Sequence, residues 1–226
     1  MQNKQYFLDF LAGHGNTGVL FEPFISRQHT ETLIWRRGAH LWRTPESYID
    51  TLIALSERTR ADVIFCDMRN YQTPAEKQAL LCAAENCSHA VEVGIAVICD
   101  NAEDLRSAES FDGICAAAVY GDAVSERLPV IRMTGSLQEA IVRGDAGWYA
   151  AENAEKYLQK SGGKVRILGG LGRDFVLSGS PVNIYAEVER LAKTYPGQWA
   201  CGSGFEIPAE NYLELISVLG AFGRLR

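Results

Sequence analysis

Ala61-Asp-Val-Ile-Phe-Cys-Asp67 is the stretch that decides the fold, because it is a short apolar run that ends in a carboxylate. A few residues later, Thr73-Pro-Ala-Glu76 joins the two side chains of a capping box to a proline at the first helical position. A buried strand followed by a helix is the repeating unit of a parallel sheet, since parallel strands need a crossover connection.

The same unit recurs along the whole chain. Seven further runs have the length and composition of buried parallel strands, at residues 18–22, 94–100, 111–119, 128–132, 146–150, 164–169 and 198–202. Helix signals lie before and between them, at residues 4–11, from Thr44, from Thr73, at 101–109, 136–143, 153–160, from Ser180 and from Ala209. Eight such units in a single domain of residues 1–226 predict a compact (β/α)8 TIM barrel of the α/β class. A doubly wound open sheet is the alternative, because periodicity alone does not separate the two folds.

The composition excludes two classes of partner. The net charge of −6 argues against nucleic acid and against an anionic membrane surface, because both need a basic footprint. No apolar run approaches the roughly 20 residues that a membrane helix requires, and the N-terminal stretch lacks the features of a signal peptide. We therefore expect a cytoplasmic protein.

The six cysteines favour buried free thiols. Four of them lie in or at the end of strand-like runs, and two lie on a helical segment; they are Cys66, Cys99, Cys115, Cys201, Cys82 and Cys87. No pair has the CxxC spacing, so a metal site would have to be assembled in three dimensions. We predict no metal.

Charged side chains end several of the predicted strands, which is where a parallel barrel places its active site. Asp67 and Arg132 are the best candidates, since each directly ends a tight apolar run. The same rim carries Glu22, Asp100, Asp122, Glu152, Arg173, Asp174 and Ser203. Taken singly, each of these residues could instead cap a helix or meet water, and Asp100 looks most like a helix N-cap.

Two glycine-rich stretches follow the last two predicted strands, at Gly169-Gly-Leu-Gly172 and Gly202-Ser-Gly204. Many barrels bind a phosphate there through backbone N–H groups. Gly170 and Ser203 are therefore candidate ligand-binding positions, with plain tight turns as the alternative.

The last third of the chain resembles a known family. It contains Gly-Gly-Lys-Val-Arg-Ile-Leu-Gly-Gly-Leu-Gly, Leu-Ser-Gly-Ser-Pro-Val-Asn and Cys-Gly-Ser-Gly-Phe-Glu-Ile-Pro-Ala-Glu-Asn-Tyr. These stretches resemble the end of uroporphyrinogen decarboxylase and of its relatives, the cobalamin-dependent methyltransferases. Leu128-Pro-Val-Ile-Arg-Met-Thr-Gly135, Ile64-Phe-Cys-Asp-Met68 and Ser26-Arg-Gln28 are similar to further motifs of that family. The resemblance implies a (β/α)8 barrel and a homodimer.

The resemblance also implies a function: a cofactor-independent carboxy-lyase of the porphyrin-biosynthesis type. Its substrate would be an acidic tetrapyrrole or another small organic anion. Asp67 would be the catalytic carboxylate that stabilises a protonated pyrrole, and Arg27, beside Gln28, would bind substrate carboxylates. The predicted substrate site also includes Glu22, Arg132, Gly170, Arg173 and Ser203.

Two other interpretations stay open. In the methyltransferases a zinc ion activates a thiol, but the matching positions here are Arg132, Thr134 and Ser203, none of which is a favoured zinc ligand. The chain could be a corrinoid-linked methyltransferase-type protein without that zinc, which would need a corrinoid partner protein. It could also be a ligand-binding member of the family without catalysis. Convergence of Arg27, Asp67 and Arg132 on one pocket would favour an enzyme.

Overall fold

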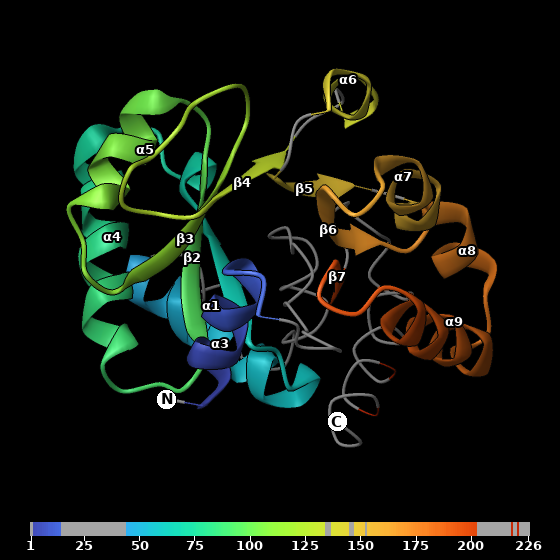
Figure 1. Cartoon of the computed structure of the whole chain (residues 1–226). Helices are drawn as coiled ribbons and strands as arrows, with labels where there is room; N and C mark the ends of the chain where they lie inside the picture. The colour runs from blue at the N-terminus through green and yellow to red at the C-terminus, as the bar shows by residue number, and fades with distance from the viewer. Residues whose placement is uncertain are drawn as a thin grey trace.

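Seven parallel strands form one curled sheet (Figure 1). This computed structural model describes residues 2–14, 44–133, 137–144, 147–151, 153–202, 218 and 221. The strands are β1 (Val63–Asp67), β2 (Gly94–Cys99), β3 (Ile114–Val119), β4 (Val130–Met133), β5 (Gly147–Ala151), β6 (Val165–Gly170) and β7 (Trp199–Gly202). Each strand pairs with its neighbour in the sequence. Because the order never doubles back, the doubly wound alternative is wrong.

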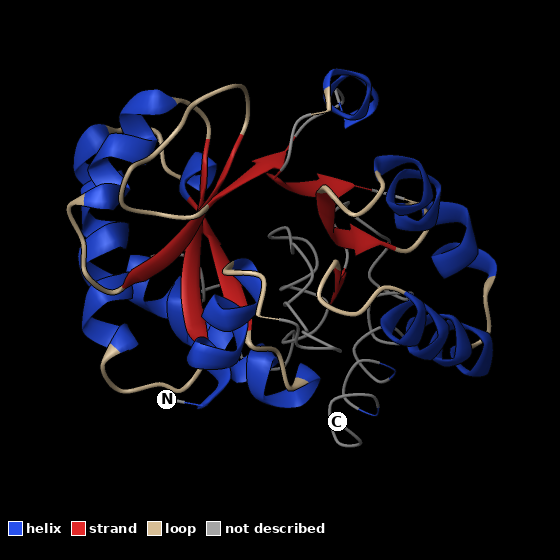
Figure 2. Ribbon diagram, in the orientation of Figure 1, coloured by secondary structure: helices blue, strands red, loops and turns tan. Residues whose placement is uncertain are grey.

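Most of the helices cover the convex side of the sheet (Figure 2), and α1 lies on the concave side. They are α1 (Gln2–Leu11), α3 (Pro45–Thr59), the 3-10 turn η1 (Met68–Asn70), α4 (Pro74–Ser88), α5 (Ala102–Glu109), α6 (Leu137–Arg143), α7 (Ala154–Ser161), α8 (Arg173–Ser178) and α9 (Pro181–Thr194). The connection from β3 to β4, which the structure describes throughout, has no helix. In Figure 1, α3 to α5 lie beside one half of the sheet and α7 to α9 beside the other.

Local sequence explains where the helices begin. The Thr44 and Thr73 side chains accept hydrogen bonds from the N–H groups three residues later, so both helices begin at the predicted N-cap ahead of a proline. The capping box at Thr73 was predicted, and the box that Ser47 closes with Thr44 was not. The N-cap of α5 is Asn101, whose side chain accepts from Glu103 and Asp104. The expectation that Asp100 caps this helix is therefore wrong, and its carboxylate is left exposed at the end of β2.

Side chains alternate between the two faces of the sheet, as in any strand. On the concave face, Phe7 and Phe10 of α1 pack against a cluster that includes Val63, Phe65 and Trp148. The Phe10 and Trp148 ring centroids lie 4.4 Å apart. The Trp148 indole N–H also donates to the Leu11 carbonyl at 3.1 Å. Helix α1 therefore fills part of the hollow of the curled sheet.

The fold is α/β and TIM-barrel-like, and the seven strands of the described residues form a curled, open part of a barrel. Seven of the eight predicted strands are confirmed, and the first, at residues 18–22, lies outside the described residues, as does nearly all of the helix expected from Ala209. Within the described residues, β1 and β7 are edges that do not pair with each other. Closure of the barrel through the strand at residues 18–22 stays a prediction.

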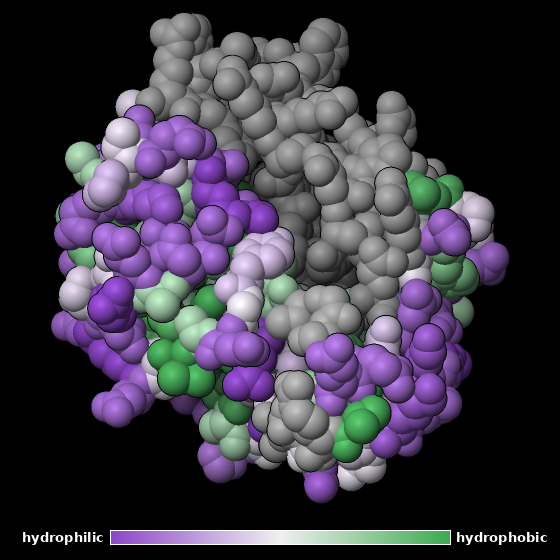
Figure 3. All heavy atoms as spheres, turned by 90° about the horizontal axis from the view of Figure 1, so that it is seen from above, coloured by the Kyte–Doolittle hydropathy of each residue, from purple (hydrophilic) through white to green (hydrophobic). Residues whose placement is uncertain are grey.

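The described surface is mainly polar. On the face shown in Figure 3, hydrophilic residues dominate and hydrophobic ones occur in small groups. No helix in the described ranges is both long and apolar enough to cross a membrane. Small scattered apolar groups of this kind are normal on a protein surface.

Candidate functional site

Asp67 occupies the C-terminal end of β1, at the edge where barrels place their sites. Val63 and Phe65, four and two residues before it, belong to the concave cluster, so Asp67 has the same strand parity. Its backbone N–H donates to the hydroxyl of Tyr48 at 2.9 Å, and Tyr48 is buried in α3. The end of the strand is thus fixed from the convex side.

Both oxygens of the Asp67 carboxylate are engaged by Arg69. Oδ1 accepts from the Arg69 backbone N–H at 3.0 Å and from Nε at 2.9 Å, and Oδ2 accepts from Nη2 at 2.7 Å. The Arg69 guanidinium also lies over the Tyr120 ring, 4.7 Å from its centroid. These hydrogen bonds to Asp67 raise the pKa of Arg69, so the guanidinium stays charged. A bidentate pair of this kind fixes the direction of the arginine as well as its charge.

The ends of β2 and β3 lie beside this pair. Tyr120 directly follows β3, and its N–H donates to the Cys99 carbonyl of β2 at 3.3 Å. Asp100 directly follows β2, and its N–H donates to Oδ2 of Asp104 at 3.2 Å. The ends of three adjacent strands therefore present Asp67, Arg69, Asp100 and Tyr120 along one edge.

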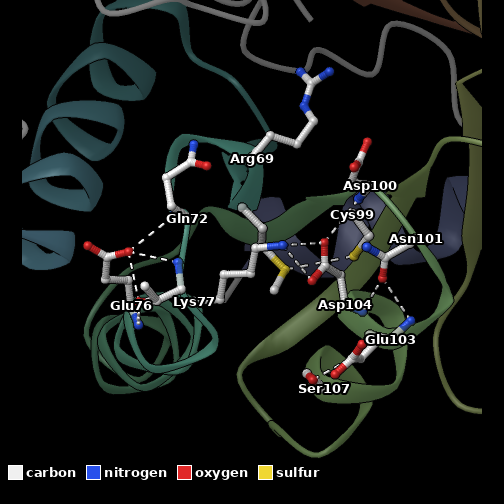
Figure 4. Close-up of polar contacts among 12 residues, drawn as sticks. Arg69, Gln72, Glu76, Lys77, Cys99, Asp100, Asn101, Glu103, Asp104 and Ser107 are labelled. Carbon is white, nitrogen blue, oxygen red and sulfur yellow. Dashed lines mark hydrogen bonds and ion pairs between the residues drawn. The ribbon is translucent and has the colours of Figure 1, made fainter.

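A buried ion pair supports this edge (Figure 4). The Lys77 ammonium of α4 donates to both carboxylate oxygens of Asp104 in α5, at 2.8 and 2.9 Å. The Asp104 side chain is only 7% exposed and that of Lys77 20%. Because Asp104 also holds the Asp100 N–H, the pair ties two helices to the end of β2.

Arg132 lies on the other face of the sheet. Its neighbours Ile131 and Met133 belong to or pack against the concave cluster, so Arg132 points to the convex side. There its Nη1 donates to the hydroxyl of Tyr149 at 3.2 Å. Asp67 and Arg132 therefore do not converge, because Asp67 has the strand parity of the concave face and Arg132 that of the convex face.

Gly170 makes room for packing at the end of β6. A Cβ atom there would lie 2.2 Å from Cβ of Ala154 and 2.9 Å from Nε1 of Trp199, and the backbone φ is +80°. A pocket of about 270 Å³ opens beside it, and its walls include Glu155 and Glu187. Both carboxylates pair with Arg190. Lys156 also lines the pocket, so its acidic and basic side chains nearly balance, and ligand binding at Gly170 stays a prediction.

The other predicted site residues lie at the start of α8, in the loop after β3, or outside the described residues. Arg173 begins α8, with its side chain outside the described part. Asp174 lies in the first turn of α8, and Asp122 is exposed in the loop after β3. Glu22, Arg27, Gln28, Glu152 and Ser203 lie outside the described residues.

The cysteines do not gather at the edge. Cys66, Cys99 and Cys201 are buried on the convex side, within the two clusters that the outer helices cover. Burial raises the pKa of Cys99 to about 12, so its thiol stays neutral. Cys82 is exposed, and the expectation that all six are buried is wrong there. Across the described ranges, no group of three or more His, Cys, Asp or Glu could hold a metal ion.

Sequence reasoning missed Arg69 and Tyr120. Their only signal is position, since each follows a buried strand by one or two residues. Arg69 joins Asp67 only because η1 turns the chain back at this point.

Comparisons with known proteins show the fold. No protein-family model matches the chain, and no curated protein matches it. A solved methyltransferase from Methanosarcina mazei superposes with a TM-score of 0.65 at 14% identity, over 97% of this chain and 98% of that one. Two further structures superpose less well. KDPG aldolase from Legionella pneumophila has a TM-score of 0.47 at 13% identity, over 96% of this chain and 97% of that one. Phosphoribosylanthranilate isomerase from Thermotoga maritima has a TM-score of 0.45 at 14% identity, over 76% of this chain and 91% of that one. The chain therefore shares its fold over nearly its whole length with a methyltransferase.

Proposed function

We propose that this chain is a methyltransferase-type protein that binds a small organic acid at the C-terminal ends of β1, β2 and β3. The observation that carries the proposal is the clamped Arg69 at this edge, where barrel enzymes bind their substrates. The reaction class is taken by analogy from the fold shared with a methyltransferase. The thin resemblance to the decarboxylase and cobalamin-dependent methyltransferase family points the same way.

In this proposal Arg69 binds the acid and Asp67 positions Arg69. A guanidinium has five N–H donors, and the contacts with Asp67 use only two of them, on Nε and Nη2. Tyr120 also interacts with the guanidinium, and Nη1 has donors that a ligand carboxylate could use. The Tyr120 ring supports the other side of the guanidinium. The arginine is thus held in place before a ligand arrives, which lowers the entropic cost of binding.

The zinc of the related methyltransferases does not fit this chain. One of the matching positions is Arg132, a cation that points to the convex side and bonds to Tyr149. The proposed reaction therefore does not use zinc. A corrinoid would be brought by a partner protein, and it would supply the methyl group.

Decarboxylation is the second candidate, and it rests on the resemblance around Asp67. The geometry supports it less well, because both oxygens of Asp67 already accept hydrogen bonds from a cation. The pair offsets both charges alike, but the guanidinium keeps N–H donors beyond these contacts, whereas both oxygens of Asp67 are already engaged.

The test is anaerobic incubation of the protein with methylcobalamin and 3-mercaptopropionate, with and without added zinc. In the expected reaction the thiolate takes the methyl group to form a thioether, the thiol proton goes to solvent, and methyl-cobalt(III) becomes cobalt(I). Absorbance follows the cobalt, and mass spectrometry follows the thioether. We expect thioether formation above the rate without protein, and no dependence on zinc.

A parallel incubation with reduced uroporphyrinogen separates the alternatives. Loss of carbon dioxide without methyl transfer would overturn the proposal in favour of the decarboxylase. No turnover in either assay would favour a ligand-binding protein without catalysis.

A further inference from the structure

Two opposite charges lie at the ends of neighbouring strands. Asp100 directly follows β2, and Arg69 lies in η1, which follows β1. The Arg69 guanidinium bonds to Asp67 at the end of β1 and lies over the ring of Tyr120, which follows β3, so it crosses the end of β2. This arrangement places both charges within reach of one small molecule. In Figure 4 both side chains extend away from the Lys77–Asp104 pair.

These two charges do not neutralise each other. The Arg69 guanidinium bonds to Asp67 and lies over Tyr120. The exposed Asp100 carboxylate bonds to no cation among the residues that the structure describes. An arginine and an aspartate at one rim would normally pair. Here the clamp on Arg69 leaves one cationic group and one anionic group available to a ligand.

Hydrogen bonds to neighbouring residues fix the positions of both Arg69 and Asp100. The Asp67 carboxylate fixes Arg69 through the backbone and the side chain. The backbone of Asp100 is fixed by Asp104, which the Lys77 ammonium holds in turn. Groups whose supports are locked by packing and hydrogen bonds form a preorganised site.

We infer that this edge binds an α-amino-acid zwitterion, with the ligand carboxylate on Nη1 of Arg69 and the ligand ammonium on the carboxylate of Asp100. The inference rests on the proposed function for the position of the site, and it names the class of acid bound there. A simple anion gains only the contact with Arg69, and a simple cation only the contact with Asp100, so each binds more weakly than a zwitterion. A zwitterion satisfies both charges at once.

The test uses three probes of the same shape: L-alanine, isobutyrate, which lacks the ammonium, and isopropylamine, which lacks the carboxylate. Binding is followed by NMR on the intact chain, through the backbone N–H signals of Asp67 and Tyr120, which every variant retains. We expect L-alanine to bind at least about tenfold more tightly than either probe with one charge. Arg69→Gln and Asp100→Asn should each abolish this preference. Arg190→Gln is the matched control, since Arg190 also pairs with carboxylates but lies on α9.

Equal binding of isobutyrate and L-alanine would overturn the inference, because Asp100 would then have no part in recognition. Absence of L-alanine binding would also overturn it. Near-UV circular dichroism of each variant separates lost binding from lost folding. L-alanine binding without methyl transfer would refute the proposed function alone. Methyl transfer by a chain that does not bind L-alanine would refute this inference alone.

Discussion

Asp67 and Arg69 show how one turn changes the role of a residue. The sequence marks Asp67 as a carboxylate that ends a buried strand, and that position is confirmed. Its partner could not be predicted, because the pair forms only when η1 brings residue 69 back over residue 67. In the structure Asp67 holds an arginine, whereas the sequence suggested that it acts on a substrate.

The Lys77–Asp104 pair gives a prediction for stability. Asp104→Asn should destabilise the fold by about 3 kcal/mol, because it leaves the largely buried Lys77 ammonium without its carboxylate. Chemical unfolding measures the loss. The double variant Lys77→Met, Asp104→Leu should recover most of it. Asp112→Asn is the control, since its exposed pair with Arg127 should be worth less than about 1 kcal/mol. A double variant as unstable as the single one would contradict this account.

Two glycines with similar backbones test the packing at the end of β6. Gly170→Ala should cost more than about 2 kcal/mol, because the new Cβ would overlap Ala154 and the φ is positive. Gly121 has a φ of +100°, and a Cβ added there would meet no atom within 4 Å. Gly121→Ala should therefore cost only the backbone strain, about 1 kcal/mol. Urea unfolding of both variants gives the comparison. Equal losses of unfolding free energy would show that glycine is needed at position 170 only for its positive φ, and that contact with Ala154 adds nothing.

At the scale of elements, caps predicted more than periodicity did. Thr-Pro and Ser-Pro pairs correctly placed the starts of α3, α4 and α9. The sequence missed α8, because six residues between glycines are too few to show a helical period. The sequence pattern also could not predict which face of the sheet each strand residue occupies. Arg132 points outward because Ile131 and Met133, on either side of it, pack on the concave face.

The capping box of α4 should make stability depend on pH. Hydrogen bonds from Thr73 lower the pKa of Glu76 below its usual value of 4.5. A carboxylate with a lowered pKa in the folded state stabilises the fold above its usual pKa, and this stabilisation is lost as the pH falls through the lowered value. Glu76→Gln should therefore be less stable than wild type at neutral pH, with a difference that shrinks in acid.

The box of α3 is the control, because its N3 residue is Ser47, which does not titrate. Ser47→Ala should cost the same at neutral and acid pH when thermal unfolding is followed across that range. If the Glu76→Gln difference is also independent of pH, the carboxylate of Glu76 does not stabilise the helix.

At the scale of the whole molecule, the order of strands was predictable and the packing of α1 on the concave side was not. Buried runs and their spacing predicted parallel β-then-α units, and the seven described strands follow that order. The sequence could not show that α1 fills the concave side, since its packing on Trp148 joins segments more than a hundred residues apart.

Phe10→Ala tests that packing. Phe10 is fully buried against Trp148, and its loss should destabilise the fold by about 3–4 kcal/mol. Chemical unfolding measures the loss, and tryptophan fluorescence of the folded state should shift as Trp148 loses its neighbour. Leu8→Ala, on the same helix but only partly buried, should cost clearly less. A similar cost for both would mean that α1 is not anchored through Phe10.

The central claim is that Arg69, held by Asp67 at the ends of β1 to β3, binds the substrate acid of a methyltransferase-type site. The most direct measurement is the rate of methyl transfer from methylcobalamin to 3-mercaptopropionate for wild type, Arg69→Gln and Arg190→Gln. The account predicts transfer by wild type, a loss of at least about tenfold in kcat/KM for Arg69→Gln, and a rate close to wild type for Arg190→Gln. Wild-type rates in Arg69→Gln, or no transfer by the wild-type protein, would contradict it.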